Sequence, residues 1–311
     1  MTDVVLTKAK GFTKKEINET VSRALDAVGY DFEEKVDLVI IKPNLCYYWD
    51  FSTGETTDPR VVSAVIDWVR QRIREDVCIV VAEADASAMR TKYAFKMLGY
   101  EKLSQIKNVK LLNLSEGEIV DRDVEVAGEN FVLPLNRVLL DADLIINVPK
   151  LKYHRLMGLT CALKNMFGAI AKPRKYVYHS RLASVIVGVN KIVNSNIILV
   201  DGVIALGKMP KKVGVIMTSD DALAADCIAA KAIGYDPSRI AYLRLGMKEK
   251  IGDASNLNLI ENPTKLEDIR KEFPKQNFLL HKLSWKLQLK MLRLYSKLSE
   301  DVIPPILDEV G

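Results

Sequence analysis

The chain has 311 residues, of which 49% are hydrophobic and 27% charged, as in a globular protein, and this composition excludes an intrinsically disordered one. No apolar run reaches the length of a transmembrane helix, and residues 1–10 lack the basic-then-apolar pattern of a signal peptide. The net charge of +5 is modest, and the four cysteines form no C-x-x-C pair, so we expect no disulfide framework and no zinc site, and a cytoplasmic location.

The first third of the chain alternates short apolar runs with helical patterns. Strands are predicted over residues 36–41, 77–82 and 109–114. Asp58 is a good N-cap for a helix with Pro59 at its first position, and a further helix over 94–103 is interrupted by Gly99. This strand–helix alternation predicts a parallel sheet with right-handed crossovers.

The rest of the chain continues the same pattern. Further strands are predicted over residues 144–148, 197–200 and 213–217. A helix over 221–233 would begin near Asp220 or Asp221 and stop at Gly234-Tyr-Asp-Pro237. We therefore predict an α/β fold with a mostly parallel sheet flanked by helices, divided into an N-terminal half (1–143), a C-terminal half (144–255) and a helical C-terminal extension (256–311).

Residues 278–298 carry leucines and a methionine at a three–four spacing, with several lysines on the same helix. Such a helix can dock its apolar stripe on the body of the protein. It can also bind a partner or lie on an anionic membrane surface. The sequence favours docking on the body, because every docked helix needs an apolar stripe.

One segment, residues 144–200, contains no Asp or Glu at all. It contains two of the three histidines and nine basic residues, namely Lys150, Lys152, Arg155, Lys164, Lys172, Arg174, Lys175, Arg181 and Lys191. Protein surfaces normally mix charges of both signs, and a surface of one sign concentrates counter-ions. The segment therefore predicts a surface that binds anions.

Polar residues follow four of the predicted strands. They lie in Lys42-Pro-Asn44, Glu83-Ala-Asp85, Asn147-Val-Pro-Lys150 and Asp201-Gly202. In open parallel sheets, ligands bind at the carboxyl ends of the strands. We therefore expect these side chains to converge on one crevice.

The strongest local signal runs from Pro149-Lys-Leu-Lys-Tyr-His154 through Gly158 to Asn165 and Gly168. A helix predicted within 159–167 would offer free backbone N–H groups to a phosphate or carboxylate. The nearby basic residues should lower the pKa of Lys164, which suits nucleophilic or proton-transfer work. His154 titrates near neutrality and is a candidate acid or base.

A second basic cluster comprises residues 172–175, Tyr178, His179 and Arg181. Basic residues interleaved with tyrosines can also hold a nucleic-acid strand. The chain has no recognition-helix, RNP or zinc-finger motif, so the sequence favours a small anion over a nucleic acid. It also has neither the P-loop nor the G-x-G-x-x-G dinucleotide signature.

The motifs resemble the family catalogued as domain of unknown function 362. The matching pieces are Ile41-Lys-Pro-Asn-Leu45, Thr56-Thr-Asp-Pro59, Pro149-Lys-Leu-Lys-x-His154, Gly158-x-Thr-x-Ala-Leu-Lys-Asn165 with Gly168, Tyr178-His179, Val200-Asp-Gly202, Asp221-x-x-x-x-Asp226 and Gly234-x-Asp-Pro237. The resemblance implies a shared α/β fold. Many relatives are described as iron–sulfur proteins with ferredoxin-type cysteine runs, which this chain lacks, so a redox role would need a separate iron–sulfur partner.

A weaker similarity links His154, Gly158 and Lys164 to the lactate racemase catalytic domain, in which a histidine is followed ten residues later by a lysine that carries a nickel-pincer nucleotide. The similarity implies that Lys164 is a cofactor lysine and His154 an acid or base. The glycine-rich sequence around that lysine is replaced here by Leu159-Thr-Cys-Ala-Leu163, so we do not assign a nickel cofactor.

These observations predict an enzyme, of oxidoreductase or isomerase type, that acts on a small anionic metabolite or cofactor bearing a phosphate or carboxylate. The predicted catalytic residues are His154, Lys164 and His179. The predicted ligand-binding residues are Lys42, Asn44, Thr57, Asp58, Glu83, Lys150, Asn165, Lys175, Tyr178, Asp201 and Asp226. The sequence identifies no cofactor and no metal. Two alternatives stay open, an accessory protein that works with an iron–sulfur partner and a nucleic-acid-binding protein.

Overall fold

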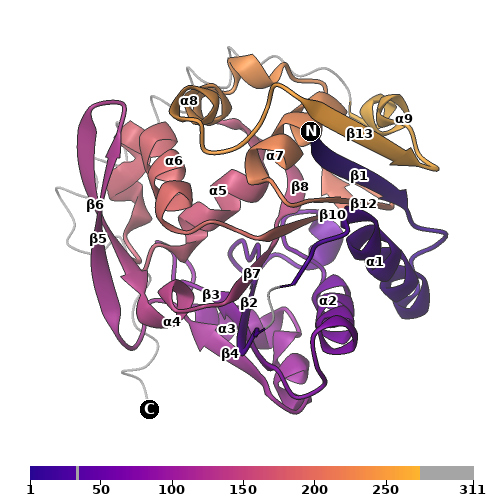
Figure 1. Cartoon of the computed structure of the whole chain (residues 1–311), viewed down its shortest axis with the longest axis horizontal. Coiled ribbons are helices and arrows are strands. Elements are labelled where there is room, and N and C mark those ends of the chain that lie inside the picture. The colour runs from indigo at the N-terminus through magenta and orange to yellow at the C-terminus, as the bar shows by residue number, and fades with distance from the viewer. Residues whose placement is uncertain (33–34, 274–311) are drawn as a thin grey trace.

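The computed structural model describes residues 1–32 and 35–273 (Figure 1). The helix predicted over 278–298 lies outside these residues. None of the helices in the described ranges has the length and apolar character needed to cross a bilayer.

Thirteen strands are present in the described part of the chain. They are β1 (Thr2–Lys8), β2 (Leu38–Pro43), β3 (Cys78–Glu83), β4 (Val109–Asn113), β5 (Ile119–Val126), β6 (Glu129–Asn136), β7 (Leu144–Val148), β8 (Lys150–His154), β9 (Gly158–Thr160), β10 (Ile197–Leu206), β11 (Pro210–Lys211), β12 (Val215–Ser219) and β13 (Leu257–Asn262). The α-helices are α1 (Lys14–Val28), α2 (Pro59–Arg72), α3 (Thr91–Met97), α4 (Arg137–Leu140), α5 (Ala162–Met166), α6 (Leu182–Ile192), α7 (Ala222–Ala232), α8 (Ala241–Glu249) and α9 (Leu266–Lys271). Short 3-10 helices are η1 (Phe51–Thr53), η2 (Tyr100–Gln105), η3 (Phe167–Ala169), η4 (Lys175–Arg181) and η5 (Pro237–Arg239).

The predicted α/β fold is confirmed. One sheet has the strand order β13-β1-β12-β10-β7-β2-β3-β4, and the five strands from β10 to β4 run parallel. Strand β12 is antiparallel to both of its neighbours, β1 and β10. Strands from both predicted halves of the chain thus lie in the same sheet, and the proposed division at residue 143 stays a prediction.

Helices cover both faces of the sheet, with α1, α2 and α3 on one side and α5, α6, α7 and α8 on the other (Figure 1). Strand β2 shows why its sequence is continuously apolar. Val39 and Ile41 enter the hydrophobic core on one face, while Ile40 enters the core on the other. A strand covered on both faces has no solvent side that would favour polar residues.

The predicted strands within the parallel part correspond to β2, β3, β4, β7 and the first half of β10. One detail of the prediction is wrong, because β10 does not end at Val200 but continues through Asp201 and Gly202 to Leu206. The strand β13 was also not expected, since residues 257–262 had been assigned to a helical extension. It pairs with β1 at the edge of the sheet.

Local signals set the helix boundaries where the sequence predicted them. Asp58 caps α2 and Pro59 is its first residue. Of the two candidates for the cap of α7, the structure selects Asp221, whose carboxylate accepts hydrogen bonds from the backbone N–H groups of Leu223 and Ala224. Gly234, with φ of +86°, follows the end of α7 in the left-handed conformation that glycine adopts readily.

A fully buried ion pair connects β8, β10 and the start of α2. Lys150 Nζ lies 2.7 Å from Asp201 Oδ2, and neither side chain is exposed to solvent. The same carboxylate accepts hydrogen bonds from the backbone N–H groups of Asp58, at 2.9 Å, and Val203, at 3.0 Å. These extra donors matter, because burying two charges costs several kcal/mol per ion unless further hydrogen bonds accompany the pair.

Removal of the α7 cap gives a first test of this fold. We expect Asp221→Ala to lower the free energy of unfolding by about 1–2 kcal/mol, because the backbone N–H groups of Leu223, Ala224 and Asp253 lose their acceptor. Asp220→Ala is the matched control, since Asp220 is the adjacent, exposed aspartate, and it should change stability little. Chemical denaturation of both variants measures the difference. Equal losses in the two variants would contradict the assignment of the cap.

The buried ion pair gives a second test. We expect Lys150→Met to lower the free energy of unfolding by about 3–5 kcal/mol, because Asp201 is left charged and buried. Adding Asp201→Asn should restore part of this loss, since the amide oxygen still accepts hydrogen bonds. Lys15→Met is the control, because Lys15 is 87% exposed and 4.0 Å from Glu19. A loss for Lys150→Met no larger than for the control would show that the pair is not needed.

Candidate functional site

The carboxyl ends of β2, β3 and β7 come together, and their polar side chains contact one another. The expected crevice that four strand ends would share stays a prediction. Lys42 Nζ, at the end of β2, lies 2.7 Å from Glu83 Oε1 at the end of β3, and both side chains are buried. Gly168 packs directly over this pair. A Cβ at Gly168 would lie 2.9 Å from Glu83 Oε1 and 3.0 Å from Lys42 Nζ, so only glycine fits there without displacing the pair.

Three asparagines form a chain of hydrogen bonds beside that pair. Asn165 Nδ2 donates to Asn147 Oδ1 at 2.8 Å, and Asn44 Nδ2 donates to Asn165 Oδ1 at 3.0 Å. Thr57 Oγ1 accepts from the backbone N–H of Asn44 and donates to the carbonyl of Val148. The predicted residues Asn44, Thr57 and Asn165 therefore join β2, β7 and α5. Their part in ligand binding stays a prediction.

Lys150, Asp201 and Asp58 lie on the other side of β7, and all three are inaccessible to solvent. Lys150 and Asp201 form the buried ion pair described above, and Asp58 also pairs with Arg60 at 2.7 Å. In this structure these charges bind one another. A ligand would reach Lys150 only if Asp201 or its surroundings moved.

Asp226 occupies the position that the sequence assigned to an anionic ligand. A helix does begin in the expected segment, as α5, but the N–H groups of Ala162 and Leu163 at its start donate to the Asp226 carboxylate. The expectation that these groups are free for a phosphate is therefore wrong. Burial raises the pKa of Asp226 to about 7, against the opposing effect of a hydrogen bond from Cys161 and those from the backbone.

Strand β8 presents basic side chains on one face. Successive residues of a strand point to opposite faces, so Lys150, Lys152 and His154 share a face, whereas Leu151 belongs to the core on the other. Lys152 Nζ donates to the backbone carbonyl of Glu55 at 2.8 Å and lies 3.0 Å from Glu55 Oε2. The spacing Lys-x-Lys-x-His, with its period of two, carried this information in the sequence.

His154 is held in one neutral tautomer. Its Nδ1 accepts hydrogen bonds from the backbone N–H groups of Leu156, at 3.2 Å, and Met157, at 3.1 Å, so the ring proton is on Nε2. Burial lowers the pKa of His154 well below its ordinary value, and the positive charges of Lys164 and Lys152 and the neighbouring His179 lower it further. At neutral pH the ring is therefore uncharged and its Nε2–H can donate.

Lys164, on α5, is half-buried beside this histidine. Burial lowers the pKa of its ammonium group to about 8, and the charge of Lys152 lowers it further, while Cys46 and Glu55 act in the opposite direction. The sequence predicted the direction of this shift but attributed it to like charges alone. Lys164 makes no hydrogen bond and no ion pair with any residue that the structure describes. We call Lys152, His154 and Lys164, together with Glu55, the basic cluster.

The segment that contains η4 packs next to the strand ends. Lys175 Nζ is buried and donates to the carbonyl of Asp85 at 2.6 Å, and burial lowers its pKa to about 8. Tyr178 packs edge-on against Phe167, with 6.2 Å between the ring centroids. His179 Nδ1 lies 3.1 Å from the carbonyl of Tyr176, and its effect on the pKa of His154 places it near the basic cluster.

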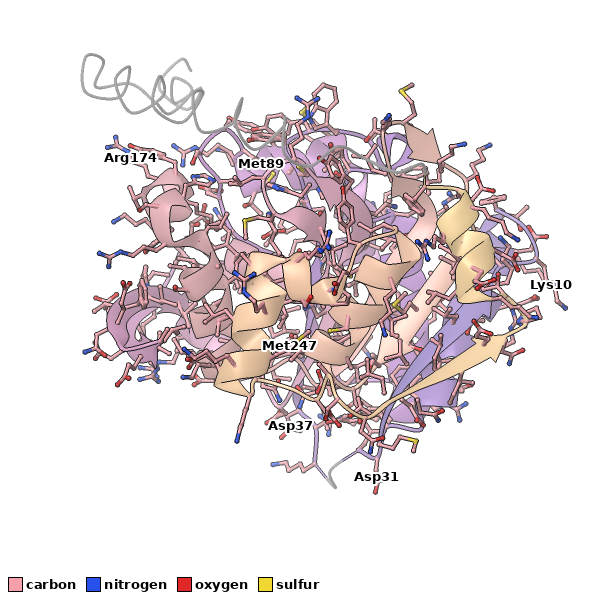
Figure 2. The ribbon with its side chains drawn as sticks, turned by 90° about the horizontal axis from the view of Figure 1, so that it is seen from above. Lys10, Asp31, Asp37, Met89, Arg174 and Met247 are labelled. Atoms are coloured by element: carbon pink, nitrogen blue, oxygen red, sulfur yellow. The ribbon has the colours of Figure 1, made fainter. Side chains whose placement is uncertain are left out.

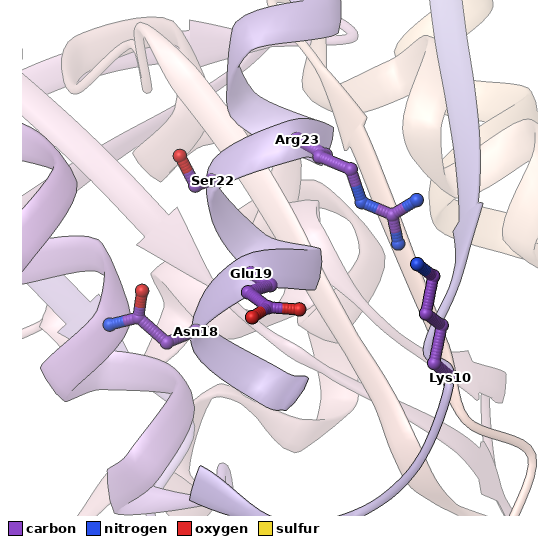
Figure 3. A pocket seen from close by; sticks show the side chains of 5 residues that line it. All are labelled: Lys10, Asn18, Glu19, Ser22 and Arg23. Atoms are coloured by element: carbon purple, nitrogen blue, oxygen red, sulfur yellow. The ribbon is translucent and has the colours of Figure 1, made fainter. Parts of the chain in front are cut away.

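A surface hollow lies elsewhere. It has a volume of about 400 Å³ and is lined by Lys10 and by four residues of α1, namely Asn18, Glu19, Ser22 and Arg23 (Figure 3). Lys10 lies at the end of the molecule opposite Arg174, a residue of the acid-free segment (Figure 2). The hollow therefore contributes nothing to the basic cluster.

Three members of the site are not among the predicted site residues. Lys152 was named only as one of the nine basic residues of the acid-free segment. Glu55 lies in the loop between β2 and α2, and nothing local links it to Lys152, 97 residues away. Thr160 faces Lys152 across the β8–β9 hairpin and is 2% exposed. In the described ranges, no group of three or more His, Cys, Asp or Glu side chains is arranged to hold a metal ion.

Comparisons with known proteins agree with the resemblances seen in the motifs. A thylakoid-associated protein of Synechocystis sp. is 26% identical over 247 residues, which cover 75% of this chain and 73% of the relative. The lactate racemase apoprotein from Thermoanaerobacterium thermosaccharolyticum is similar in structure, with a TM-score of 0.51 and 14% sequence identity. That match covers 75% of this chain but only 56% of the racemase chain, so it shows a shared fold alone.

The thylakoid association is that of the relative, and the cytoplasmic location stays a prediction. A family model described as domain of unknown function (DUF362) matches residues 39–231, which is more than half of the chain. On this match, the chain belongs to the family of domain of unknown function 362.

Proposed function

We propose that this protein is an enzyme that binds a small anionic metabolite or cofactor, bearing a carboxylate or a phosphate, at the basic cluster. The observation that carries the proposal is the state of Lys164. Lys164 is half-buried and its ammonium group makes no hydrogen bond or ion pair with a described residue, although a buried cation is normally paired. An anionic ligand would supply the missing partner.

Two groups of the basic cluster, Lys164 and His154, support proton-transfer chemistry. With a pKa of about 8, Lys164 is mostly protonated at neutral pH and holds an anion, while its deprotonated fraction is a nucleophile. His154 is neutral and presents Nε2–H as a hydrogen-bond donor or acid. Of the two predicted reaction types, isomerase and oxidoreductase, the fold shared with a lactate racemase supports the isomerase.

The weaker motif similarity implies a cofactor attached to Lys164, and the structure fits that idea in one respect only. The amine is half-buried, unpaired and of lowered pKa, as acylation requires. The N–H groups at the start of α5 already bind Asp226, so they offer nothing to a phosphate of such a cofactor. We therefore keep the lysine as the point of attachment and propose no further contact.

Amine reactivity tests the state of Lys164. We expect an amine-specific reagent to label Lys164 with a rate that rises to a plateau as the pH passes through about 8, because only the uncharged amine reacts. Ordinary lysines, with pKa values near 10.4, should still be gaining reactivity at pH 9. Peptide mass mapping of pulse-labelled protein gives both profiles. A Lys164 profile like that of the other lysines would contradict the proposed environment.

Ligand binding tests the function itself. We expect Lys164→Met to weaken the binding of inorganic phosphate or acetate by about tenfold or more, because a hydrogen bond to a charged group contributes about 1.5–3 kcal/mol. His154→Gln should weaken it less, since the neutral ring contributes a hydrogen bond and no charge. Lys172→Met is the matched control, because Lys172 is exposed in the same acid-free segment. Isothermal titration calorimetry measures all four proteins.

Intact-mass spectrometry of the full chain, first native and then denatured, complements the titrations. An increase over the mass of the chain that survives denaturation and maps to Lys164 would show a covalently attached cofactor. An added mass that is present only under native conditions would identify a non-covalently bound ligand by its molecular weight. Unchanged anion affinity in both the Lys164→Met and His154→Gln variants would overturn the proposed function.

A further inference from the structure

The loop between β2 and α2 is fixed against β10 where it crosses the basic cluster. Gly54 has φ of +73°, and a Cβ there would lie 3.0 Å from the backbone of Ala205 and Leu206. Glycine is required at this point for both reasons. The close contact holds the next residue, Glu55, above Lys152 of β8.

Glu55 acts on both lysines of the basic cluster. Its Oε2 lies 3.0 Å from Lys152 Nζ, and its negative charge raises the pKa of Lys164. Its side chain is 32% exposed, whereas that of Lys152 is 6% exposed. The carboxylate therefore enters the basic cluster from the solvent side, along the direction from which a dissolved anion would arrive.

The Lys152–Glu55 ion pair differs from the two buried lysine–carboxylate pairs near the strand ends. The Lys42–Glu83 and Lys150–Asp201 pairs are buried on both sides, and separating them would leave a charge without water or partner. Glu55 can turn into solvent instead. Lys152 would keep one acceptor, because its Nζ also donates to the backbone carbonyl of Glu55 at 2.8 Å.

A second observation indicates that an oxygen ligand is missing here. The hydroxyl of Thr160 is buried and has no hydrogen-bond partner in the described part of the chain. Thr160 is the register partner of Lys152 in the β8–β9 hairpin, so both side chains lie on the same face. A buried hydroxyl without a partner is uncommon and is expected to meet a ligand or water.

We propose that the Glu55 carboxylate is a built-in competitor, which occupies the anion position beside Lys152 and must leave it when the ligand anion binds. This inference rests on the proposed function, because it assumes that an anion binds at the basic cluster. Glu55 then sets how tightly the site holds its ligand. It selects for ligands whose own carboxylate or phosphate binds the two lysines better than Glu55 does.

The test compares Glu55→Gln with the wild-type chain in calorimetric titrations with inorganic phosphate and, separately, with acetate. Glutamine keeps the size of the side chain and removes its charge. We expect Glu55→Gln to bind each probe roughly three- to fivefold more tightly, the size expected when a partly exposed ion pair no longer has to be broken. Glu118→Gln is the matched control, because Glu118 pairs with Arg137 at 3.0 Å and lies outside the basic cluster.

The outcomes separate this inference from the proposed function. If Glu55→Gln binds as the wild type does, or more weakly, while Lys164→Met loses affinity, the competitor role is wrong and the anion site stands. If neither the wild-type chain nor any variant binds phosphate or acetate, both proposals are wrong. Glu55→Ala repeats the comparison should the glutamine form a new hydrogen bond to Lys152, and thermal unfolding of each variant confirms that it is folded.

Discussion

Charges buried at the carboxyl edge of the sheet determine how the rest of the site is built. Lys150 and Asp201 face each other without solvent, and the carboxylate also binds the N–H group of Asp58 at the start of α2. Such a pair is tolerable only where every donor and acceptor finds a partner, because isolated charges are expensive to bury. The strands β8 and β10 and the helix α2 are therefore fixed relative to one another, and the basic cluster forms on this fixed support.

Most of the basic segment serves the architecture of the protein. Lys150 neutralises Asp201, and Lys175 binds a backbone carbonyl of the β3–α3 connection. Lys164 is different, because it is half-buried and makes no ion pair with any residue in the described chain. A run of basic residues in a sequence can therefore contain two kinds of cation. Some balance buried acidic side chains of the protein itself, and others are available to a ligand. Only the folded positions distinguish them.

The parts of the fold that depend on neighbouring residues were predictable. The apolar runs of β2 and β3 and the Asp58-Pro59 start of α2 can be read from a few adjacent residues. Contacts between distant residues could not be read in the same way. Asp226 reaches α5 from 64 residues away, and this long-range contact is why the anion position predicted at that helix start was wrong.

The same distinction between local and long-range contacts decides which residues of the site could be predicted. His154 and Lys164 stand ten residues apart and were recognised together, and the structure places them within electrostatic reach of each other. Glu55 carries no signal of its own, since a glutamate in a loop is ordinary until a lysine from another part of the chain approaches it. The pairing of β1 with β12 and β13 was missed for a similar reason, because it joins the two ends of the described chain.

The β8–β9 hairpin has a consequence for how the site tolerates change. Residues of β8 alternate between a basic face and an apolar one, and the register pairs His154 with Gly158 and Lys152 with Thr160. A shift of that register by one residue would send Leu151 and Tyr153 to the ligand side and bury Lys150 and Lys152 in the core. Insertions and deletions in the turn at 155–157 should thus be far more damaging than substitutions there, because the length of the turn, more than its composition, keeps the site basic.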